Sequence, residues 1–212
     1  MISKSRAIKI IDLLNKEYPE SKTALYYKTP FQLLIATILS AQCTDKKVNE
    51  ITPHIFRKYK DVYGFSKAKR EDLEQDVYST GFYRNKTKNI ITLSKILVED
   101  FNGIVPDSMD VLIKLPGVAR KTANILLSSV FEKAEGIAVD THVKRLSNRL
   151  GFSSSRNPNR IEKDLMKIFP KKYWLKFNYI LVSHGREVCK AKAPLCSKCI
   201  VRNICDSEDK QE

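Results

Sequence analysis

Apolar residues recur at the spacing of an α-helix along nearly the whole chain, and this period limits the possible folds more than any other feature. Ile8, Ile11 and Leu14 lie on one face of a segment that Pro19 closes. Strand-like alternation is almost absent, and GIAV at 136–139 is the one short candidate. The sequence therefore predicts an all-α fold.

Capping signals locate several helix starts. Thr29 followed by Pro30 opens the almost wholly apolar segment FQLLIATILSAQ, which predicts a core helix that also takes in Cys43. Thr44 is in position to cap the helix that follows, and Asp140 to cap a later one. Further helices are expected at 86–101, 120–131, 158–169 and 173–188.

A short turn with the sequence LPGVARKT, residues 115–122, separates two of the predicted helices. Arg120 and Lys121 stand at the start of the second helix, where the helix dipole favours anions over cations. The arrangement becomes favourable if a bound phosphate supplies negative charge at this end of the helix. Gly117 has no side chain to keep a phosphate away from the backbone, and the N–H groups around Gly117 and Ala119 can donate hydrogen bonds to it. The turn therefore predicts a phosphate-binding helix–hairpin–helix. An ordinary corner between two helices, with a solvated basic rim, is the alternative.

The charge balance favours the first of these alternatives. The chain holds 38 Lys and Arg against 24 Asp and Glu, a formal net charge of +14 at pH 7. An excess of this size indicates a polyanionic partner such as nucleic acid, although net charge alone also fits a merely soluble basic protein. No apolar run reaches the ~20 residues of a membrane span, and the N-terminal segment lacks the apolar core of a signal peptide. We therefore expect an intracellular protein that binds no membrane.

Four of the five cysteines lie within 17 residues near the C-terminus, in the pattern C-x6-C-x2-C-x5-C. Thiolates this close in an intracellular helical protein predict a metal site formed by Cys189, Cys196, Cys199 and Cys205. A single C-x2-C with long flanks is less typical of zinc than of an iron–sulfur cluster, but the residues alone leave both metals open.

Two residues are candidates for chemistry. Lys121 on the hairpin could be a nucleophile, because a deprotonated lysine amine attacks electrophilic carbon. Asp140, nineteen positions later, could relay a proton or stabilise positive charge that develops on a sugar. Each also has a simpler interpretation, Lys121 as a phosphate contact and Asp140 as a helix cap. Lys190 and Lys192, on the cysteine loop, are expected to contact the DNA backbone, unless they only keep that loop soluble.

With these features in place, the sequence resembles the endonuclease III family, the bifunctional DNA glycosylases and AP lyases of the helix–hairpin–helix glycosylase superfamily. The likeness runs from about residue 20 to Cys205 and includes LPGVARKTAN, AVDTHVKRLSNRLG and LLIATILSAQCTD. In this order and spacing the motifs are highly specific. The cysteine spacing is similar to the family's iron–sulfur loop, so the resemblance implies a [4Fe–4S] cluster on the four clustered cysteines.

The resemblance implies a fold of two parts. A six-helix barrel is expected over residues 23–133, with the helix–hairpin–helix at about 108–131. An iron–sulfur cluster domain is expected from residues 1–22 and 134–212, with the cluster loop at 189–205, and DNA would lie in a cleft between the two. The implied partner is double-stranded DNA with damaged bases or abasic sites, bound by a monomer in the cytoplasm in association with the nucleoid.

The resemblance also implies roles for single residues. Lys121 would attack the sugar C1′ of a flipped, damaged pyrimidine and displace the base, and β-elimination would then break the strand on the 3′ side. Asp140 would assist base loss. Gln42 would fill the gap left by the flipped base, Phe82 would wedge into the stack, and His142 would line the site. Further DNA contacts are expected from the hairpin residues Gly117, Val118, Ala119 and Arg120.

Three of these residues have structural alternatives: Gln42 as a helix C-cap, Phe82 as a core residue and His142 as a partly buried helix residue. Two positions depart from the family pattern. Ala119 stands where the hairpin commonly has a second glycine, and phosphate binding is expected to survive if this position needs no left-handed backbone. Phe82 is bulkier than the aliphatic wedge expected there.

Two rival functions are consistent with parts of the sequence. A monofunctional mismatch glycosylase of the same superfamily would release a base by water attack, but such enzymes usually lack the hairpin lysine that Lys121 supplies here. A catalytically silent DNA-binding module would use the hairpin and the cysteine loop only to hold the backbone, and it predicts binding without strand cleavage.

Overall fold

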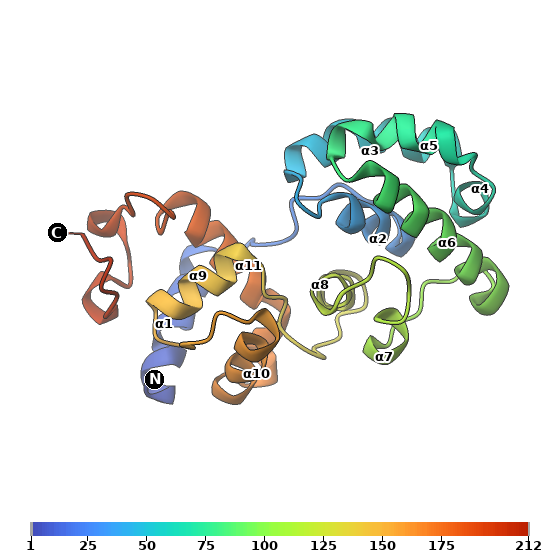
Figure 1. The fold of residues 1–212 in the computed structure, drawn as a ribbon. Coiled ribbons are helices and arrows are strands. Elements are labelled where there is room, and N and C mark those ends of the chain that lie inside the picture. Colours follow the sequence, from blue (N-terminus) through green and yellow to red (C-terminus); the bar gives the residue numbers. More distant parts are fainter. Residues whose placement is uncertain (1, 212) are drawn as a thin grey trace. The chain divides into compact units, whose positions relative to one another are not determined.

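The computed structural model describes residues 2–211, and every regular element among them is a helix (Figure 1). The prediction of an all-α fold is confirmed. The chain forms two compact units, which we call the central unit (24–131) and the split unit (2–23 with 132–211). Residues 1 and 212, which the predicted iron–sulfur domain included, lie outside the described residues.

The one strand candidate, residues 136–139, is wrong. This segment has no regular secondary structure, and no element among residues 2–211 is a strand. The segment is nevertheless buried, because its apolar side chains pack into the split unit. The Asn178 side chain donates a hydrogen bond of 3.0 Å to the Ala138 carbonyl, so a side chain satisfies a backbone group that a neighbouring strand would otherwise pair.

The central unit is built around α2 (Pro30–Leu39), in which eight of ten residues are buried. Helix α2 contacts α3, α6 and α8, and a helix that is apolar on all sides is typical of one surrounded by others. The elements that follow α2 in this unit are α3 (Asp45–Tyr59), α4 (Val62–Ser66), α5 (Arg70–Val77), the 3-10 turn η1 (Tyr78–Thr80), α6 (Tyr83–Phe101), α7 (Met109–Leu112) and α8 (Arg120–Val130).

Helix α2 ends at Leu39, three residues before the predicted end at Gln42. Ser40 helps to end it, because its hydroxyl donates a 2.9 Å hydrogen bond to a carbonyl in the last turn. Cys43 therefore lies in the bend before α3, half-buried against the core, and the prediction that it belongs to the core helix is wrong. Thr44 caps α3 as predicted, since its hydroxyl accepts an N–H of the first turn at 3.2 Å.

One carboxylate joins α3 to α5. Asp76 accepts hydrogen bonds from the Lys58 ammonium at 2.7 Å and the Tyr59 hydroxyl at 2.6 Å, and the His54 imidazole lies 3.5 Å away. Burial alone would raise the pKa of the Asp76 carboxyl, but the hydrogen bonds from Lys58 and Tyr59 outweigh it and hold the pKa below its usual value. Burial, together with the hydrogen bond to Asp76, raises the pKa of Tyr59 to about 12.

The split unit is assembled around α11 (Trp174–Glu187), which contacts α1 and α9. Three buried rings, Phe152, Phe169 and Phe177, pack with centroids 4.8 to 6.3 Å apart. The first helix of the chain thus shares a core with the last ones. Besides α11 the unit contains α1 (Lys4–Glu17), α9 (Thr141–Arg149), α10 (Pro158–Ile168), η2 (Lys171–Tyr173), η3 (Cys196–Lys198) and η4 (Arg202–Ile204). Within the described part of the chain, no helix combines the length and the apolarity needed to cross a membrane.

Candidate functional site

The predicted hairpin lies between α7 and α8 in the central unit. Gly117 has a φ of +79°, which favours glycine, and a Cβ at this position would lie in tight contact, 3.0 Å, with the Cβ of Asn89. The Val118 N–H donates to the Leu115 carbonyl at 3.1 Å and closes the turn. Ala119 has φ −85° and ψ 166°. Because this position needs no left-handed backbone, alanine replaces the family's second glycine without strain.

Two N–H groups of the turn are available to an anion. Gly117 and Ala119 are exposed, and their N–H groups have no hydrogen-bond partner among residues 2–211. Ala119 precedes α8, an 11-residue helix whose N-terminus no side chain caps, so the helix dipole favours negative charge there. Val118 differs, because its side chain is buried and its N–H is already bonded. Neither the side chain nor the N–H of Val118 is therefore free to make the DNA contact predicted for this residue.

Lys121 is the second residue of α8 and is exposed. Its side chain makes no hydrogen bond or ion pair with any residue that the structure describes. Helical side chains lean toward the N-terminus of their helix, so the Lys121 amine can reach the space in front of the turn. Arg120, beside it, is half-buried. The hairpin therefore combines an anion site with a lysine amine that the fold leaves available.

Gln42 and Phe82 are two of four exposed residues of the central unit on left-handed backbone, the others being Lys60 and Asn102. Gln42 has φ 54° and Phe82 has φ 48°, both in the left-handed region, and Phe82 is 64% exposed. For residues other than glycine this conformation costs about 1–3 kcal/mol and is concentrated at functional sites. The structural alternatives for both are wrong: Ser40 occupies the C-cap of α2, and Phe82 is outside the core. Phe82 directly precedes α6, which begins at Tyr83, three residues earlier than predicted.

Helix α9 of the split unit carries Asp140 and His142 at its start. Asp140 Oδ1 accepts the Val143 N–H at 2.8 Å, so the predicted cap is confirmed. Its second carboxylate oxygen has no hydrogen-bond partner among the described residues and can meet a ligand. His142 is half-buried, as the structural alternative expected, and accepts a 3.3 Å contact from Arg145 on Nδ1. Gly185 of α11 leaves room for this ring, because a Cβ there would lie 2.7 Å from Nδ1.

The four clustered cysteines line one cavity in the split unit. All four are half-buried and none is in a disulfide. Apolar walls come from Leu150, Val188, Leu195 and Val201, and cationic side chains from Arg149, Arg202 and Lys210. Burial raises the pKa of the Cys199 and Cys205 thiols, and the neighbouring cysteines add to the effect. A bound metal would compensate, since it favours the thiolate form.

The donor set of this cavity can be compared with the needs of zinc and of an iron–sulfur cluster. Among residues 2–211, no three Cys, His, Asp or Glu side chains lie close enough to share a single metal ion. Zinc needs sulfur ligands at about 2.3 Å from one ion. An iron–sulfur cluster spaces its thiolates more widely, because each binds a different iron. Four cysteines around one cavity with apolar walls supply the thiol donors that a [4Fe–4S] cluster would need.

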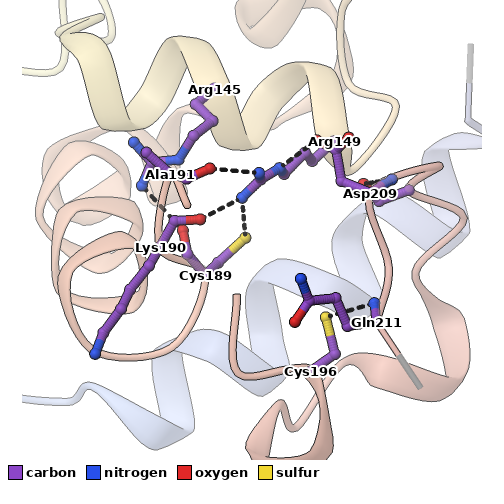
Figure 2. A network of polar contacts seen from close by, with 9 residues as sticks. Arg145, Arg149, Cys189, Lys190, Ala191, Cys196, Asp209 and Gln211 are labelled. Carbon is purple, nitrogen blue, oxygen red and sulfur yellow. Dashed lines mark hydrogen bonds and ion pairs between the residues drawn. The ribbon is translucent and has the colours of Figure 1, made fainter. Parts of the chain in front are cut away.

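Two arginines of α9 hold the backbone of the cysteine loop (Figure 2). Arg149 donates to the carbonyls of Lys190 at 2.7 Å and of the next residue at 3.1 Å, and its Nη1 lies 3.5 Å from Cys189 Sγ. Arg145 donates to the Cys189 carbonyl at 2.9 Å. Lys190 and Lys192 are exposed, and Figure 2 shows the Lys190 side chain directed away from both arginines. The loop is thus fixed by the two arginines and presents Lys190 on the other side.

Sequence reasoning missed Arg145 and Arg149. A signal was present, because two cations four residues apart on one helix face repel each other unless other groups compensate. It also missed His184, which is buried with its Nε2 3.6 Å from Cys199 Sγ. Burial lowers the pKa of His184 to about 4, so the ring is neutral at pH 7 beside the cysteine cavity.

Comparison with known proteins gives a consistent result. Residues 35–171 match the family model described as HhH-GPD superfamily base excision DNA repair protein. A curated relative, endonuclease III from Synechocystis sp. (strain ATCC 27184 / PCC 6803 / Kazusa), is 49% identical over 204 residues, which cover 96% of this chain and 93% of the relative.

Two solved structures match over nearly the full length of both chains. One is a non-covalent endonuclease III–DNA complex, with 43% identity and a TM-score of 0.92, covering 97% of this chain and 96% of the other. The second is a trapped covalent endonuclease III–DNA intermediate, an estranged-adenine complex. It has the same identity and TM-score and covers 97% of each chain.

Proposed function

This chain belongs to the HhH-GPD superfamily of base excision DNA repair proteins, within its endonuclease III family, and we propose that it is a bifunctional DNA glycosylase and AP lyase. It removes oxidised pyrimidines from double-stranded DNA and cleaves the strand 3′ to the resulting abasic site. A covalent endonuclease III–DNA intermediate at 43% identity supports this reaction, because a Schiff base is a covalent enzyme–DNA bond.

The observation that carries the proposal is the hairpin. The exposed N–H groups of Gly117 and Ala119 stand beside an available lysine amine, Lys121, at the uncapped N-terminus of α8. A DNA phosphate on the two N–H groups would supply the negative charge that this end of the helix favours. It would also hold the sugar–phosphate backbone within reach of the lysine.

We assign the nucleophile to Lys121. Its deprotonated amine attacks C1′, the glycosidic C–N bond breaks, and the departing base takes up a proton. Loss of a proton from the nitrogen and opening of the sugar ring give a protonated Schiff base at C1′. This cation acidifies the C2′ protons, and when one is removed the C3′–O bond breaks and the 3′ phosphate leaves. Hydrolysis of the imine then frees the lysine.

Asp140 supports base loss in this proposal. Its Oδ1 is committed to capping α9, which holds the carboxylate in one orientation. The other oxygen can stabilise positive charge developing on the sugar or relay a proton. A fixed, half-buried carboxylate is suited to this task, because it needs no reorganisation when the charge appears.

Gln42 and Phe82 are proposed to open the duplex. Extruding a base costs a few kcal/mol of stacking and pairing, and groups that occupy the vacated space offset this cost. Both side chains are exposed on backbone held in the left-handed region, so they project from the surface without packing into the core. His142 is proposed to line the site through its exposed edge.

The remaining contacts are to the DNA backbone. Arg120, Lys190 and Lys192 supply positive charge, and each phosphate that they neutralise releases counterions. Arg149 of α9 holds the Lys190 carbonyl and Arg145 holds the Cys189 carbonyl, which fixes the loop from which both lysines project. We propose that Cys189, Cys196, Cys199 and Cys205 hold a [4Fe–4S] cluster. When bound, the cluster supplies a cross-link that stabilises this loop.

The predicted domain assignment follows from the same proposal. The central unit corresponds to the barrel with the helix–hairpin–helix, and the split unit to the iron–sulfur domain. The protein is proposed to act as a monomer on chromosomal DNA in the cytoplasm. The cleft in which DNA would lie stays a prediction of the family resemblance.

Borohydride trapping tests the proposal. Wild-type protein, incubated with a duplex that contains thymine glycol or an abasic site, should form a stable covalent adduct when sodium borohydride is added. Lys121→Gln should form none. Lys114→Gln is the matched control, because it removes one exposed positive charge from the same hairpin. Lys114→Gln should weaken DNA binding about as much as Lys121→Gln does, but it should still form the covalent adduct.

Three results would contradict the assignment. An adduct that persists in Lys121→Gln places the nucleophile elsewhere. Base release by the wild-type protein without any adduct indicates a monofunctional glycosylase. Binding without base release or cleavage indicates the silent DNA-binding module.

A further inference from the structure

Lys86 has an environment that is unusual for a lysine. Its side chain is buried, with 5% of its surface exposed, in the first turns of α6. Its Nζ donates hydrogen bonds of 2.8 Å to the Leu39 carbonyl and 2.8 Å to the Thr80 carbonyl. No carboxylate among residues 2–211 forms an ion pair with it. A buried charge without a counter-charge is expensive, so its partners need a physical explanation.

Both acceptors end a helical element and lack an intrahelical donor. Leu39 is the last residue of α2, and Thr80 is the last residue of η1. The negative end of the α2 dipole favours a cation at Leu39, which offsets part of the cost of burial. Burial lowers the pKa of the Lys86 amine, and a neutral amine would still have two N–H groups for the two carbonyls.

Each acceptor also begins a loop that carries an exposed residue on strained backbone. The chain leaves Leu39 and reaches Gln42 three residues later, and it leaves Thr80 and reaches Phe82 two residues later. The backbone N–H of Lys86 donates to the Phe82 carbonyl at 3.1 Å. One residue thus ties together the α2 end, the η1 end and the start of α6. These three points set where the Gln42 and Phe82 loops stand relative to each other.

We infer that Lys86 is a positioning residue that holds Gln42 and Phe82 at the separation needed to open a DNA duplex. The inference rests on the proposed function, because it concerns the two side chains assigned to that step. Strained loops keep their conformation only where surrounding structure holds them, and here the bridging ammonium does so. Without it the Leu39 and Thr80 carbonyls lose their common donor, and both loops can relax toward less strained backbone.

The test compares duplex with single-stranded DNA. Lys86→Met removes the donors and keeps an unbranched, apolar side chain. Ile90→Ala, at a buried position on the same helix, is the control for a general loss of stability. Both variants are first checked for helical content and melting temperature, and assayed well below the melting transition. Borohydride trapping rates are then measured on an abasic site in a duplex and in the same strand alone, where no stack has to be opened.

Lys86→Met should lower the trapping rate on the duplex about 10- to 100-fold, because a small misplacement of positioning groups has an effect of that size. The rate on single-stranded DNA should change no more than about 2- to 3-fold, since Lys121 is untouched. Ile90→Ala should change both rates by the same factor. Adding Lys86→Met to Phe82→Ala should have little further effect, because the two residues act in one step.

Equal changes on the two substrates in Lys86→Met would overturn the inference, and so would full additivity with Phe82→Ala. If Lys86→Met does not fold, Lys86→Gln replaces it and should show the same selective loss, because its shorter side chain cannot reach both carbonyls. A wild-type protein that is trapped on neither substrate refutes the proposed function itself. Normal trapping by the wild type, with Lys86→Met behaving like Ile90→Ala, refutes only the inference.

Discussion

The two roles of Asp140 can be separated by substitution. Its Oδ1 accepts the Val143 N–H at 2.8 Å and caps α9, while the other oxygen is assigned to base loss. Asp140→Asn keeps an N-cap of nearly equal quality and removes the negative charge. Asp140→Ala removes both the cap and the charge. The two variants therefore differ in stability but are alike in lacking a carboxylate.

The expected magnitudes differ enough to be distinguished. Loss of an N-cap costs about 1 kcal/mol, in a range of about 0.5–2, whereas asparagine caps almost as well as aspartate. For a chain of this size each kcal/mol lowers the melting temperature by about 2–4 °C. Loss of a proton-transfer group lowers the rate by about 10²- to 10⁴-fold, which corresponds to about 3–5 kcal/mol of activation free energy. Asp140→Asn should thus be nearly as stable as wild type and almost inactive in base release.

The assay measures base release from a thymine-glycol duplex under single-turnover conditions, alongside thermal melting followed by circular dichroism. β-Elimination at a preformed abasic site is measured separately, because Asp140 is assigned to base loss and that step should be less affected. Asn157→Ala is the control for capping. Its side chain caps α10 in the same unit through hydrogen bonds of 2.9 and 3.2 Å. It should lower the melting temperature like Asp140→Ala and leave base release unchanged.

The reasoning is refuted if Asp140→Asn releases the base within about 3-fold of the wild-type rate. Asp140 would then be only a helix cap. It is refuted equally if activity falls in proportion to stability across Asp140→Asn, Asp140→Ala and Asn157→Ala.

Three further predictions concern the hairpin, the cysteine loop and pH. Gly117→Ala should destabilise the protein by about 1–2 kcal/mol in thermal melts and weaken binding to abasic-site duplex in fluorescence anisotropy, because its φ is +79° and an added Cβ would crowd Asn89. Unchanged binding would contradict the phosphate site. Arg149→Met leaves two carbonyls of the cysteine loop without a donor, and each unsatisfied carbonyl costs about 1–3 kcal/mol of stability. The purified variant should therefore have a lower iron-to-protein ratio, and an unchanged ratio would show that the loop needs no such support. Asp76→Asn should lower the free energy of unfolding at pH 7. The difference from wild type should shrink as pH falls through and below 3.8, because the pKa of the Asp76 carboxyl is depressed in the folded state and its stabilising contribution is lost when it is protonated. Urea unfolding at several pH values measures this, and a difference that does not change with pH would show that the Lys58 contact contributes nothing.

Much of the local structure could be predicted because its causes lie within a few residues. Thr44 and Asp140 cap their helices through side-chain oxygens that reach an N–H three residues on. The sequence predicts a turn at Gly117, and its φ of +79° is one that glycine adopts readily. The same local reasoning misjudged the end of α2, because an apolar run does not reveal where the backbone leaves the helix. It also proposed a strand at 136–139, where an apolar segment is buried without a partner strand.

The features that position the site depend on groups far apart in the sequence. Lys86 and the Leu39 carbonyl are separated by 47 residues, and Arg149 and the Lys190 carbonyl by 41. In the sequence Lys86 is one of many lysines, and nothing within a few positions shows that it is buried. Gln42 and Phe82 likewise have ordinary neighbours, and their strained backbone becomes visible only in the folded chain.

The sequence by itself therefore determined the all-helical fold, the hairpin turn with a lysine at the start of the next helix, and the four clustered cysteines. Each of these follows from periodicity, capping or spacing, which operate over a turn or a short loop. Only the tertiary structure decided which loops are held rigid, by which donors, and which side chains are left exposed. Those outcomes depend on burial and on hydrogen bonds between distant segments, whose free energies exist only once the core has formed.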